Sequence, residues 1–469
     1  MHKFDRLMQI KSFIFAARSR FRSAKRHGFM RSVGVLVGGT ALAQAITVLA
    51  LPLLSRLYTP LDFSLIAVFS SVLAILSVAA CFRLEIAIPM PELDEDAANL
   101  LVLALCACCM VATTVGLCVW WFPTQIVDLL KQPALLPYLW LLPLGIWMAS
   151  SYTALQFWAT RKKRFSTIAK TRMTQAIGGV GTQAGMGWAG FTPFGLLLGQ
   201  VVSSGAGLFG LGRDALHDTA FRRINCGTMC RMLRRYDRFP KYSTVEALAN
   251  SAGIQLPILV IAALAVGPEA GYLMLATRTM ASPMGLIGGA VSQVYLSRAP
   301  EEMRAGRLGA FTSHVISGLA KTGVGPLVFV GLIAPVVFPI VFGEKWQRAG
   351  DLVAWMTPWF VMQFLASPVS MALHVTGSQR AALILQIFGL FFRIGAVVVA
   401  AWLMPARIVE VYAISGFVFY FIYLYVVMQL SRLEISEFLS ELRSSAIVVC
   451  AWISFGALLA LCLPALLNK

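Results

Sequence analysis

Charged residues are scarce in this chain, and acidic ones are the scarcest. Asp, Glu, Lys and Arg make up 13% of the 469 residues, against about 25% in an average soluble domain. Hydrophobic residues make up 58%, and the mean hydropathy is +0.76. These proportions exclude a water-soluble protein and indicate a polytopic membrane protein, with no room for a soluble catalytic domain between its apolar stretches.

Several motifs that would carry other functions are also missing. The first thirty residues lack the apolar core and cleavage site of a signal peptide, so we interpret them as a basic segment at the inner membrane surface, either an amphipathic helix or an unstructured tail. The nine cysteines form no disulfide or metal-binding pattern. Neither a zinc-protease motif, a nucleotide-binding glycine loop nor a carboxylate pair occurs in the external loops, the longest of which covers 122–135. We therefore expect no enzymatic activity and no cofactor.

Thirteen stretches are long and apolar enough to cross a bilayer, which takes about 20 helical residues. They cover residues 33–57, 63–88, 97–121, 136–158, 166–188, 191–212, 242–265, 270–296, 314–342, 350–375, 379–403, 408–430 and 445–466. We therefore expect an all-α protein with a basic N-terminal segment, two six-helix bundles joined by a basic linker, and an additional C-terminal helix. The corresponding ranges are 1–32, 33–212, 213–241, 242–430 and 431–469.

The two predicted bundles begin alike. Each starts with a proline-containing span, followed by a turn with Pro60 or Pro268 and a second span led by an aromatic residue. Because six is an even number, both bundles enter the membrane in the same direction, so a pseudo-two-fold axis along the membrane normal would relate them. This is the plan of a transporter that rocks two bundles around a central site.

The fifth span, 166–188, is polar and rich in glycine. Lipid does not accept such a helix, so we expect its polar face to contact neighbouring helices or a water-filled cavity. Gly181 and Gly185 are predicted to allow close approach of those neighbours.

Lysine and arginine are distributed unevenly between the two sets of loops. The set that includes the N-terminus, residues 161–172 and the 213–241 linker holds 29 of them, and the opposite set holds six. The positive-inside rule therefore places the N-terminus and the linker in the cytoplasm. The formal net charge of +18 is explained by basic loops beside anionic membrane lipids, and no nucleic-acid partner is needed.

Three motifs resemble one family of membrane transporters. They are the Leu-Ser-Arg-Leu-Tyr-Thr-Pro turn at 54–60, the Arg-Leu-Glu-x-Ala-Ile-Pro sequence at 83–89 with the acidic run 92–96 behind it, and the TRTMASPMGLIGGAVSQVYLSRAPEE stretch at 277–302. In these motifs the chain resembles the Wzx-type oligosaccharide flippases, which are polysaccharide biosynthesis transporters of the multidrug/oligosaccharidyl-lipid/polysaccharide exporter superfamily.

The resemblance implies a specific transport function. A protein of this kind would move a polyprenyl-pyrophosphate-linked oligosaccharide from the inner to the outer leaflet of the bacterial cytoplasmic membrane by alternating access. The cargo would be a precursor of O-antigen lipopolysaccharide, capsule or exopolysaccharide, delivered to the polysaccharide polymerase machinery. The alternative is an ion-coupled multidrug exporter of the same superfamily. Its cavity should be acidic and aromatic, whereas the buried charges here are mainly basic.

Apart from the basic residues counted with the loops, four lie inside predicted spans: Arg83, Arg278, Lys321 and Arg393. An Arg near the membrane centre costs roughly 2.5–3.5 kcal/mol, so it should face a wet cavity or a partner. Guanidinium groups bind phosphate oxygens through paired, charge-assisted hydrogen bonds. We therefore interpret the four as candidate pyrophosphate-binding residues, with Arg278 foremost. Arg83 and Lys321 are close enough to the cytoplasmic interface to reach it instead.

Uncharged polar residues also lie within the spans. Gln44, Asn250, Gln255 and Gln293 are candidate partners for sugar hydroxyls. The same side chains are equally suited to hydrogen bonds between helices.

Only two carboxylates are candidates for coupling to a proton or Na⁺ gradient, Glu85 and Glu246. The alternative is that each is paired with a neighbouring basic residue. Because Glu85 and Arg83 are two positions apart, a continuous helix would point them to different faces.

Overall fold

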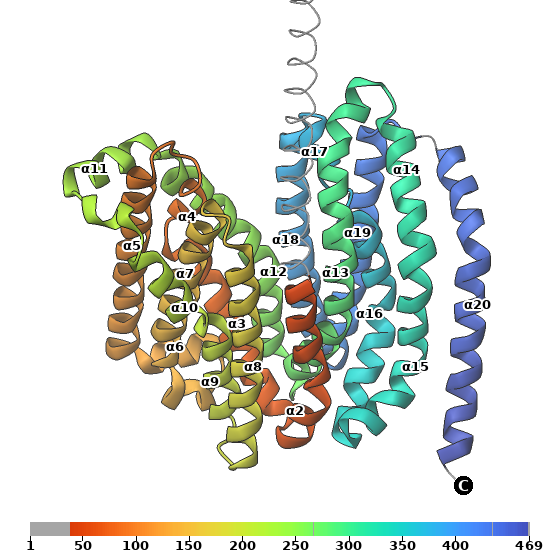
Figure 1. Ribbon diagram of the computed structural model, residues 1–469. Helices are drawn as coiled ribbons and strands as arrows, with labels where there is room; N and C mark the ends of the chain where they lie inside the picture. Colours follow the sequence, from red (N-terminus) through yellow and green to blue (C-terminus); the bar gives the residue numbers. More distant parts are fainter. Residues whose placement is uncertain (1–37, 266, 434, 468–469) are drawn as a thin grey trace, which may run out of the picture.

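The molecule consists of two bundles of helices that lie side by side (Figure 1). The computed structural model describes residues 38–265, 267–433 and 435–467, with a few side chains left out. Within these ranges it contains no β-strand, and each of the thirteen predicted spans contains a helix. The all-α, two-bundle architecture is therefore confirmed, while the predicted N-terminal segment 1–32 lies outside the described residues.

The N-terminal half runs from the first membrane helix to α10. Its helices are Gly38–Leu57, whose last two turns are α2 (Leu51–Leu57), then α3 (Pro60–Ala80), α4 (Leu84–Ala87), α5 (Asp94–Trp121), α6 (Pro123–Leu130), α7 (Leu141–Arg161), α8 (Phe165–Trp188), α9 (Phe194–Gly205) and α10 (Leu208–Leu216). The linker is not a simple loop, because it contains α11 (Cys226–Arg235) between the short helices η2 (Thr219–Arg223) and η3 (Phe239–Ser243).

The C-terminal half holds the remaining helices. They are α12 (Thr244–Leu264), α13 (Glu269–Arg304), α14 (Leu308–Leu319), α15 (Gly325–Phe342), α16 (Gln347–Ala366), α17 (Ala372–Val375), α18 (Gln379–Leu403), α19 (Ile408–Leu430) and α20 (Ile435–Leu467). The last of these is the predicted additional helix, which packs against α14 and α15 at the edge of the molecule (Figure 1). Among the described residues, nine helices are long and apolar enough to cross a membrane, so this is a multi-pass membrane protein.

The turn before α3 shows how local sequence sets a helix boundary. Thr59 precedes the helix, and its side chain accepts a hydrogen bond from the Asp62 backbone N–H. The Asp62 carboxylate in turn accepts one from the Thr59 N–H at 2.8 Å. Pro60 occupies the first helical position, where its missing N–H costs nothing.

The second predicted span, 63–88, is too long. Helix α3 ends at Ala80, because Phe82 and Arg83 adopt left-handed φ angles of 49° and 56°. The tenth span, 350–375, is also interrupted, since α16 ends at Ala366 and a turn separates it from α17.

The loop between α4 and α5 is held by one side chain, Arg161. Its guanidinium donates hydrogen bonds to four backbone carbonyls, those of Ile88, Pro89, Pro91 and Glu92, and to the carboxylate of Asp94. These bonds satisfy carbonyls that no helix uses, which fixes the inner end of α5 against α7.

The polar fifth span, α8, packs tightly against α9, as expected for a helix that cannot face lipid. The glycines that allow this are different from those predicted. Gly181 and Gly185 have open space around them, whereas a Cβ at Gly179 would lie 2.5 Å from the Ser203 Cβ and one at Gly187 would lie 2.8 Å from the Tyr58 ring.

The two halves are hydrogen-bonded near the ends that the charge distribution places outside. Ser55 Oγ donates to the Phe342 carbonyl at 3.1 Å, and Trp346 Nε1 donates to the Ser55 carbonyl at 2.9 Å. A third bond runs from the Gly271 N–H to Ser64 Oγ at 2.9 Å. In Figure 1 the halves meet at the lower end, near α2, and diverge toward the upper end, where α11 and α17 lie. The described conformation is therefore closed at the end near α2.

Gly271 is the position at which this closure is most sensitive. A Cβ there would collide with the Pro60 carbonyl oxygen, so Gly271→Val should separate α13 from α3 and destabilise the closed conformation by about 1–3 kcal/mol. Spin labels at the exposed Leu61 and Lys345 should report a longer distance in double electron–electron resonance, in a background whose seven exposed cysteines are replaced by serine. Gly285→Ala on the same helix has open space and is the control. An unchanged distance distribution in Gly271→Val would contradict this role.

Candidate functional site

A polar cavity lies where the two halves meet, with a volume of about 390 Å³. Its walls come from the Gly38–Leu57 helix, α7, α8 and α9 of the N-terminal half and from α13 of the C-terminal half. The polar lining residues are Thr40, Gln44, Thr47, Tyr152, Gln156, Arg172, Gln175, Gln183, Gln200, Ser203 and Arg278. Two arginines and five glutamines are among them, and no carboxylate is.

Arg278 reaches across the interface between the halves. It comes from α13, and its Nη2 donates a hydrogen bond to Gln200 Oε1 on α9 at 3.2 Å. The side chain is half-buried. The expectation that this arginine faces a cavity agrees with its position in the structure.

The second arginine of the cavity, Arg172, was not among the candidates. It was counted with the basic stretch 161–172, although it lies inside the predicted span 166–188. Helix α8 begins at Phe165, so seven residues carry Arg172 about 10 Å into the bundle. Arg172 Nη1 donates to Thr40 Oγ1 at 3.0 Å. A signal was present in the sequence, because Arg172, Gln175 and Gln183 are spaced by three and eight and share one helix face.

The glutamines are held in different ways. Gln175 Nε2 donates to the Ser204 carbonyl at 3.0 Å, and Gln183 Nε2 donates to the Leu196 carbonyl at 3.5 Å. Gln44 is the one glutamine of the cavity that was predicted, and its Oε1 is buried without a hydrogen-bond partner among the described atoms. A buried acceptor of this kind is costly unless a ligand or water supplies a donor.

Arg393 lies elsewhere, between helices of the C-terminal half. It is 5% exposed, its Nε donates to the Gly389 carbonyl at 2.9 Å, and its guanidinium lies 4.9 Å from the centre of the Phe419 ring. The helix carbonyl and the face of the ring together stabilise the positive charge of Arg393. Arg393 does not line the cavity around Arg278.

The other candidate residues are also separated from that cavity. Gln255 Oε1 accepts a hydrogen bond from Ser71 Oγ at 3.0 Å, which joins α12 to α3. Lys321, Glu246 and Asn250 are exposed, and the side chain of Gln293 lies outside the described residues. Of the two roles considered for Gln255, the structure therefore shows the hydrogen bond between helices.

Glu85 and Arg83 form an ion pair, with Oε1 and Nη1 3.6 Å apart. The expectation that they face different sides is wrong, because the left-handed residues after α3 break the helix that would have separated them. Both line a small cavity of about 150 Å³ between α3 and α7, together with Ser77, Ser150 and others. The Glu85 residue is 3% exposed, and its Oε2 has no partner among the described atoms.

The environment of Glu85 alters its titration. It lies beyond the end of the membrane-spanning helix α3, and burial raises the pKa of its carboxyl, while a backbone hydrogen bond and the charge of Arg83 oppose that rise. A carboxyl with a raised pKa takes up a proton more readily than an exposed one does. The geometry thus fits either a structural ion pair or a proton-binding group.

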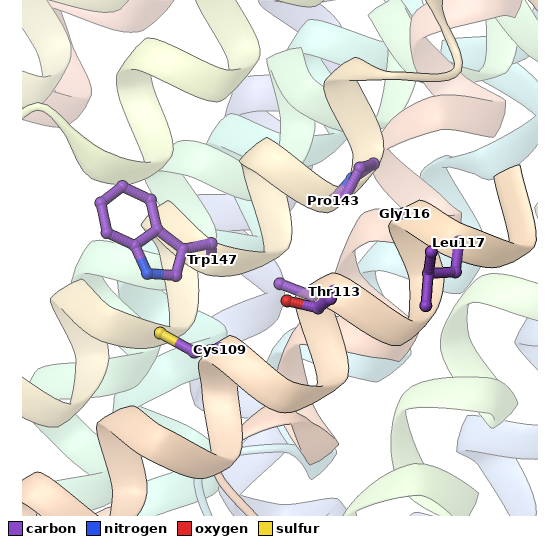
Figure 2. A pocket seen from close by; sticks show the side chains of 7 residues that line it. Cys109, Thr113, Gly116, Leu117, Pro143 and Trp147 are labelled. Carbon is purple, nitrogen blue, oxygen red and sulfur yellow. The ribbon is translucent and has the colours of Figure 1, made fainter. Parts of the chain in front are cut away.

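A third cavity, of about 480 Å³, lies between α5 and α7 (Figure 2). Cys109, Thr113 and Leu117 face it from one helix, and Pro143 and Trp147 from the other. No charged residue lines it, so it does not fit a pyrophosphate.

The family of the chain follows from its sequence. The family described as polysaccharide biosynthesis protein matches residues 53–351, which is more than half of the chain. This chain belongs to that family. No curated protein matches its sequence.

Solved structures similar to this member of the polysaccharide biosynthesis protein family are membrane transporters. The lipid II flippase MurJ, in an inward closed conformation, superposes with a TM-score of 0.70 at 12% identity, over 91% of this chain and 96% of that one. An inward-facing multidrug resistance MATE transporter of the MOP superfamily gives 0.52 at 15% identity, over 86% and 98%. A eukaryotic MATE transporter gives 0.53 at 14%, over 88% and 100%. At these identities the likeness shows the fold alone, which is the fold of the predicted superfamily.

Removing one member of the Arg83–Glu85 pair should destabilise the N-terminal half. Arg83→Gln leaves the Glu85 carboxylate buried without its counter-charge, which costs about 3 kcal/mol in comparable pairs. The double variant Arg83→Gln/Glu85→Gln removes both charges and should recover most of that loss. Thermal unfolding in detergent measures both effects, and a double variant no more stable than the single one would show that the pair does not act as a unit.

Proposed function

We propose that this protein flips a polyprenyl-pyrophosphate-linked oligosaccharide, a precursor of O-antigen, capsule or exopolysaccharide, across the bacterial cytoplasmic membrane. The observation that carries the proposal is the cavity between the halves, which contains Arg278 and Arg172 and no carboxylate among its lining residues. Two guanidinium groups suit a diphosphate, and glutamine amides suit sugar hydroxyls. Membership of a polysaccharide biosynthesis family and a fold shared with a lipid II flippase support the same assignment.

The mechanism follows from the position of Arg278 between the halves. With the outer end closed, the headgroup enters from the cytoplasmic side while the polyprenyl chain stays in the bilayer. Binding of the diphosphate gives Arg278 a stronger partner than Gln200, so the contact between α13 and α9 is replaced by contacts to substrate. Rocking of the halves then opens the outer end, and the headgroup leaves toward the polymerase machinery with the N-terminus remaining cytoplasmic.

The multidrug exporter alternative fits the cavity less well. A cavity for organic cations needs negative charge or exposed aromatic faces. The lining of this one carries two positive charges and one aromatic residue, Tyr152. An organic cation would therefore be repelled, whereas a diphosphate would be attracted.

Replacing Arg278 tests the substrate assignment. Arg278→Gln removes the charge without creating a large cavity, and loss of a charge-assisted hydrogen bond of about 1.5–3 kcal/mol should slow flipping at least about tenfold. The measurement is the leaflet distribution of polyprenyl-pyrophosphate oligosaccharides in a deletion strain complemented with each variant at equal expression. Arg304→Gln, exposed at the far end of the same helix, is the control.

The outcomes of that experiment are distinct. Inner-leaflet accumulation rescued by wild type and Arg304→Gln, and not by Arg278→Gln, supports both the function and the site. Rescue by the wild type and by both variants would show that the diphosphate does not bind at Arg278. A normal distribution in the deletion strain would favour the multidrug exporter.

We also propose that Glu85 couples transport to the proton gradient. It is the buried candidate, with a free carboxylate oxygen and a raised pKa, whereas Glu246 is exposed. Below its pKa in the folded protein Glu85 is protonated and releases Arg83, and above that pKa the ion pair forms. A proton bound or lost on one side of the membrane would therefore alter the packing of α3 against α7.

Flipping in proteoliposomes tests this coupling. An inward proton gradient should accelerate the wild type several-fold and leave Glu85→Gln at its basal rate, because the amide cannot titrate. Glu246→Gln should behave as the wild type does. Acceleration of Glu85→Gln to the wild-type extent, or acceleration of the wild type by a Na⁺ gradient at constant pH in place of protons, would contradict coupling through Glu85.

A further inference from the structure

A groove in the C-terminal half is lined by charged residues at one end and by apolar residues at the other. It has a volume of about 430 Å³ and lies between α16 and α19. Its lining residues are Arg348, Trp355, Met404, Ala406, Arg407, Glu410, Val411 and Ile414. It is separate from the cavity around Arg278, and neither the family nor the transport mechanism assigns it a role.

Charge and hydrophobicity are separated along the groove. On α16, Arg348 is at the outer end and Trp355 follows seven residues later; before and along α19, Arg407 is at the outer end and Ile414 follows seven residues later. Seven helical residues span about 10 Å, so on both walls the groove changes from charged to apolar over the same depth. This matches a lipid with its headgroup outermost and its acyl chains inside the bilayer.

The apolar part of the groove is open to the membrane. Trp355 is 51% exposed and Ile414 is 49% exposed, on helices whose other faces pack in the bundle. A Trp at the boundary between headgroups and acyl chains is a common membrane anchor. Acyl chains can therefore lie along the groove without leaving the bilayer.

At the polar end lies a carboxylate that can still accept a hydrogen bond. Arg348 Nη2 lies 2.7 Å from Glu410 Oε1, and Arg348 Nε lies 3.1 Å from Glu269 Oε1. The Glu410 residue is 7% exposed, yet its Oε2 has no hydrogen-bond partner among the described atoms. Such an oxygen requires a donor, and Glu410 lines the same groove as Arg407, whose side chain is exposed.

A carboxylate acceptor and a guanidinium in one groove favour a lipid headgroup that carries one positive and one negative charge. We propose that the groove binds a phosphoethanolamine lipid of the outer leaflet. Its ammonium donates to Glu410 Oε2, its phosphate accepts from Arg407, and its chains lie against Trp355 and Ile414. A phosphatidylglycerol headgroup lacks the ammonium, and the quaternary nitrogen of phosphatidylcholine has no N–H to donate, so both should bind more weakly.

The test is lipid binding to the purified full-length protein, measured by native mass spectrometry with dioleoyl phosphatidylethanolamine, phosphatidylcholine and phosphatidylglycerol. The wild type should bind phosphatidylethanolamine at least about tenfold more tightly than either of the others, the effect of one charge-assisted hydrogen bond. Glu410→Gln should abolish that preference. Glu344→Gln, an exposed carboxyl at the same end of the molecule, should retain it.

Two further variants keep the proposal testable where Glu410→Gln disturbs the fold. Arg407 and Ile414 are exposed, so their replacement spares the core. Arg407→Ala should weaken phosphatidylethanolamine and phosphatidylglycerol alike, and Ile414→Trp should fill the groove and weaken all three lipids. Equal binding of the three lipids to the wild type, unchanged binding in Ile414→Trp, or displacement of phosphatidylethanolamine by a polyprenyl diphosphate would each overturn the assignment. The last result would make the groove an exit site for the transported lipid.

Discussion

A charge inside a membrane has to be given partners, and most of the polar architecture of this protein follows from that constraint. Hydrocarbon offers no hydrogen bonds, so each buried charge requires a counter-charge, a dipole, a ring face or water. Arg278 bonds to Gln200 in a polar cavity, and Arg393 uses a helix carbonyl and the Phe419 ring. Just beyond the membrane-spanning helix α3, the buried Glu85 is likewise paired with Arg83. The partners differ in how easily a substrate could displace them. The neutral amide of Gln200 is the partner that a diphosphate would replace most easily.

Closure of the two halves at the end near α2 depends on short-range packing. The bonds that join the halves there use small or rigid groups, such as the Ser55 hydroxyl and the indole N–H of Trp346. The close crossing of α3 and α13 is possible because residue 271 is glycine. Contacts of this kind are either fully made or lost, since a packed interface is not continuously deformable. A transporter that alternates between two conformations needs an interface with that property.

The fold is shared with a lipid II flippase and with multidrug transporters, so the fold does not choose between these substrates. The choice rests on the lining of the cavity. Two guanidinium groups and a set of glutamines favour an anionic, hydroxyl-rich headgroup, and they come from both halves of the molecule. Under the proposed function, substrate binding would depend on the relative position of the halves, because Arg278 comes from one half and Arg172 and the glutamines come from the other.

The sequence by itself determined the all-α membrane fold and its division into two halves, because hydropathy acts over neighbouring residues. It also showed that Arg278 lies within a span and requires a partner. Only the tertiary structure decided which partner. Arg172 and Gln200 join Arg278, Glu85 turns toward Arg83, and Gly179 meets α9 where Gly181 does not. Helix α8 marks its inward face with polar residues, but most membrane helices are apolar on nearly all sides. For those helices, packing against neighbours decides which face points inward.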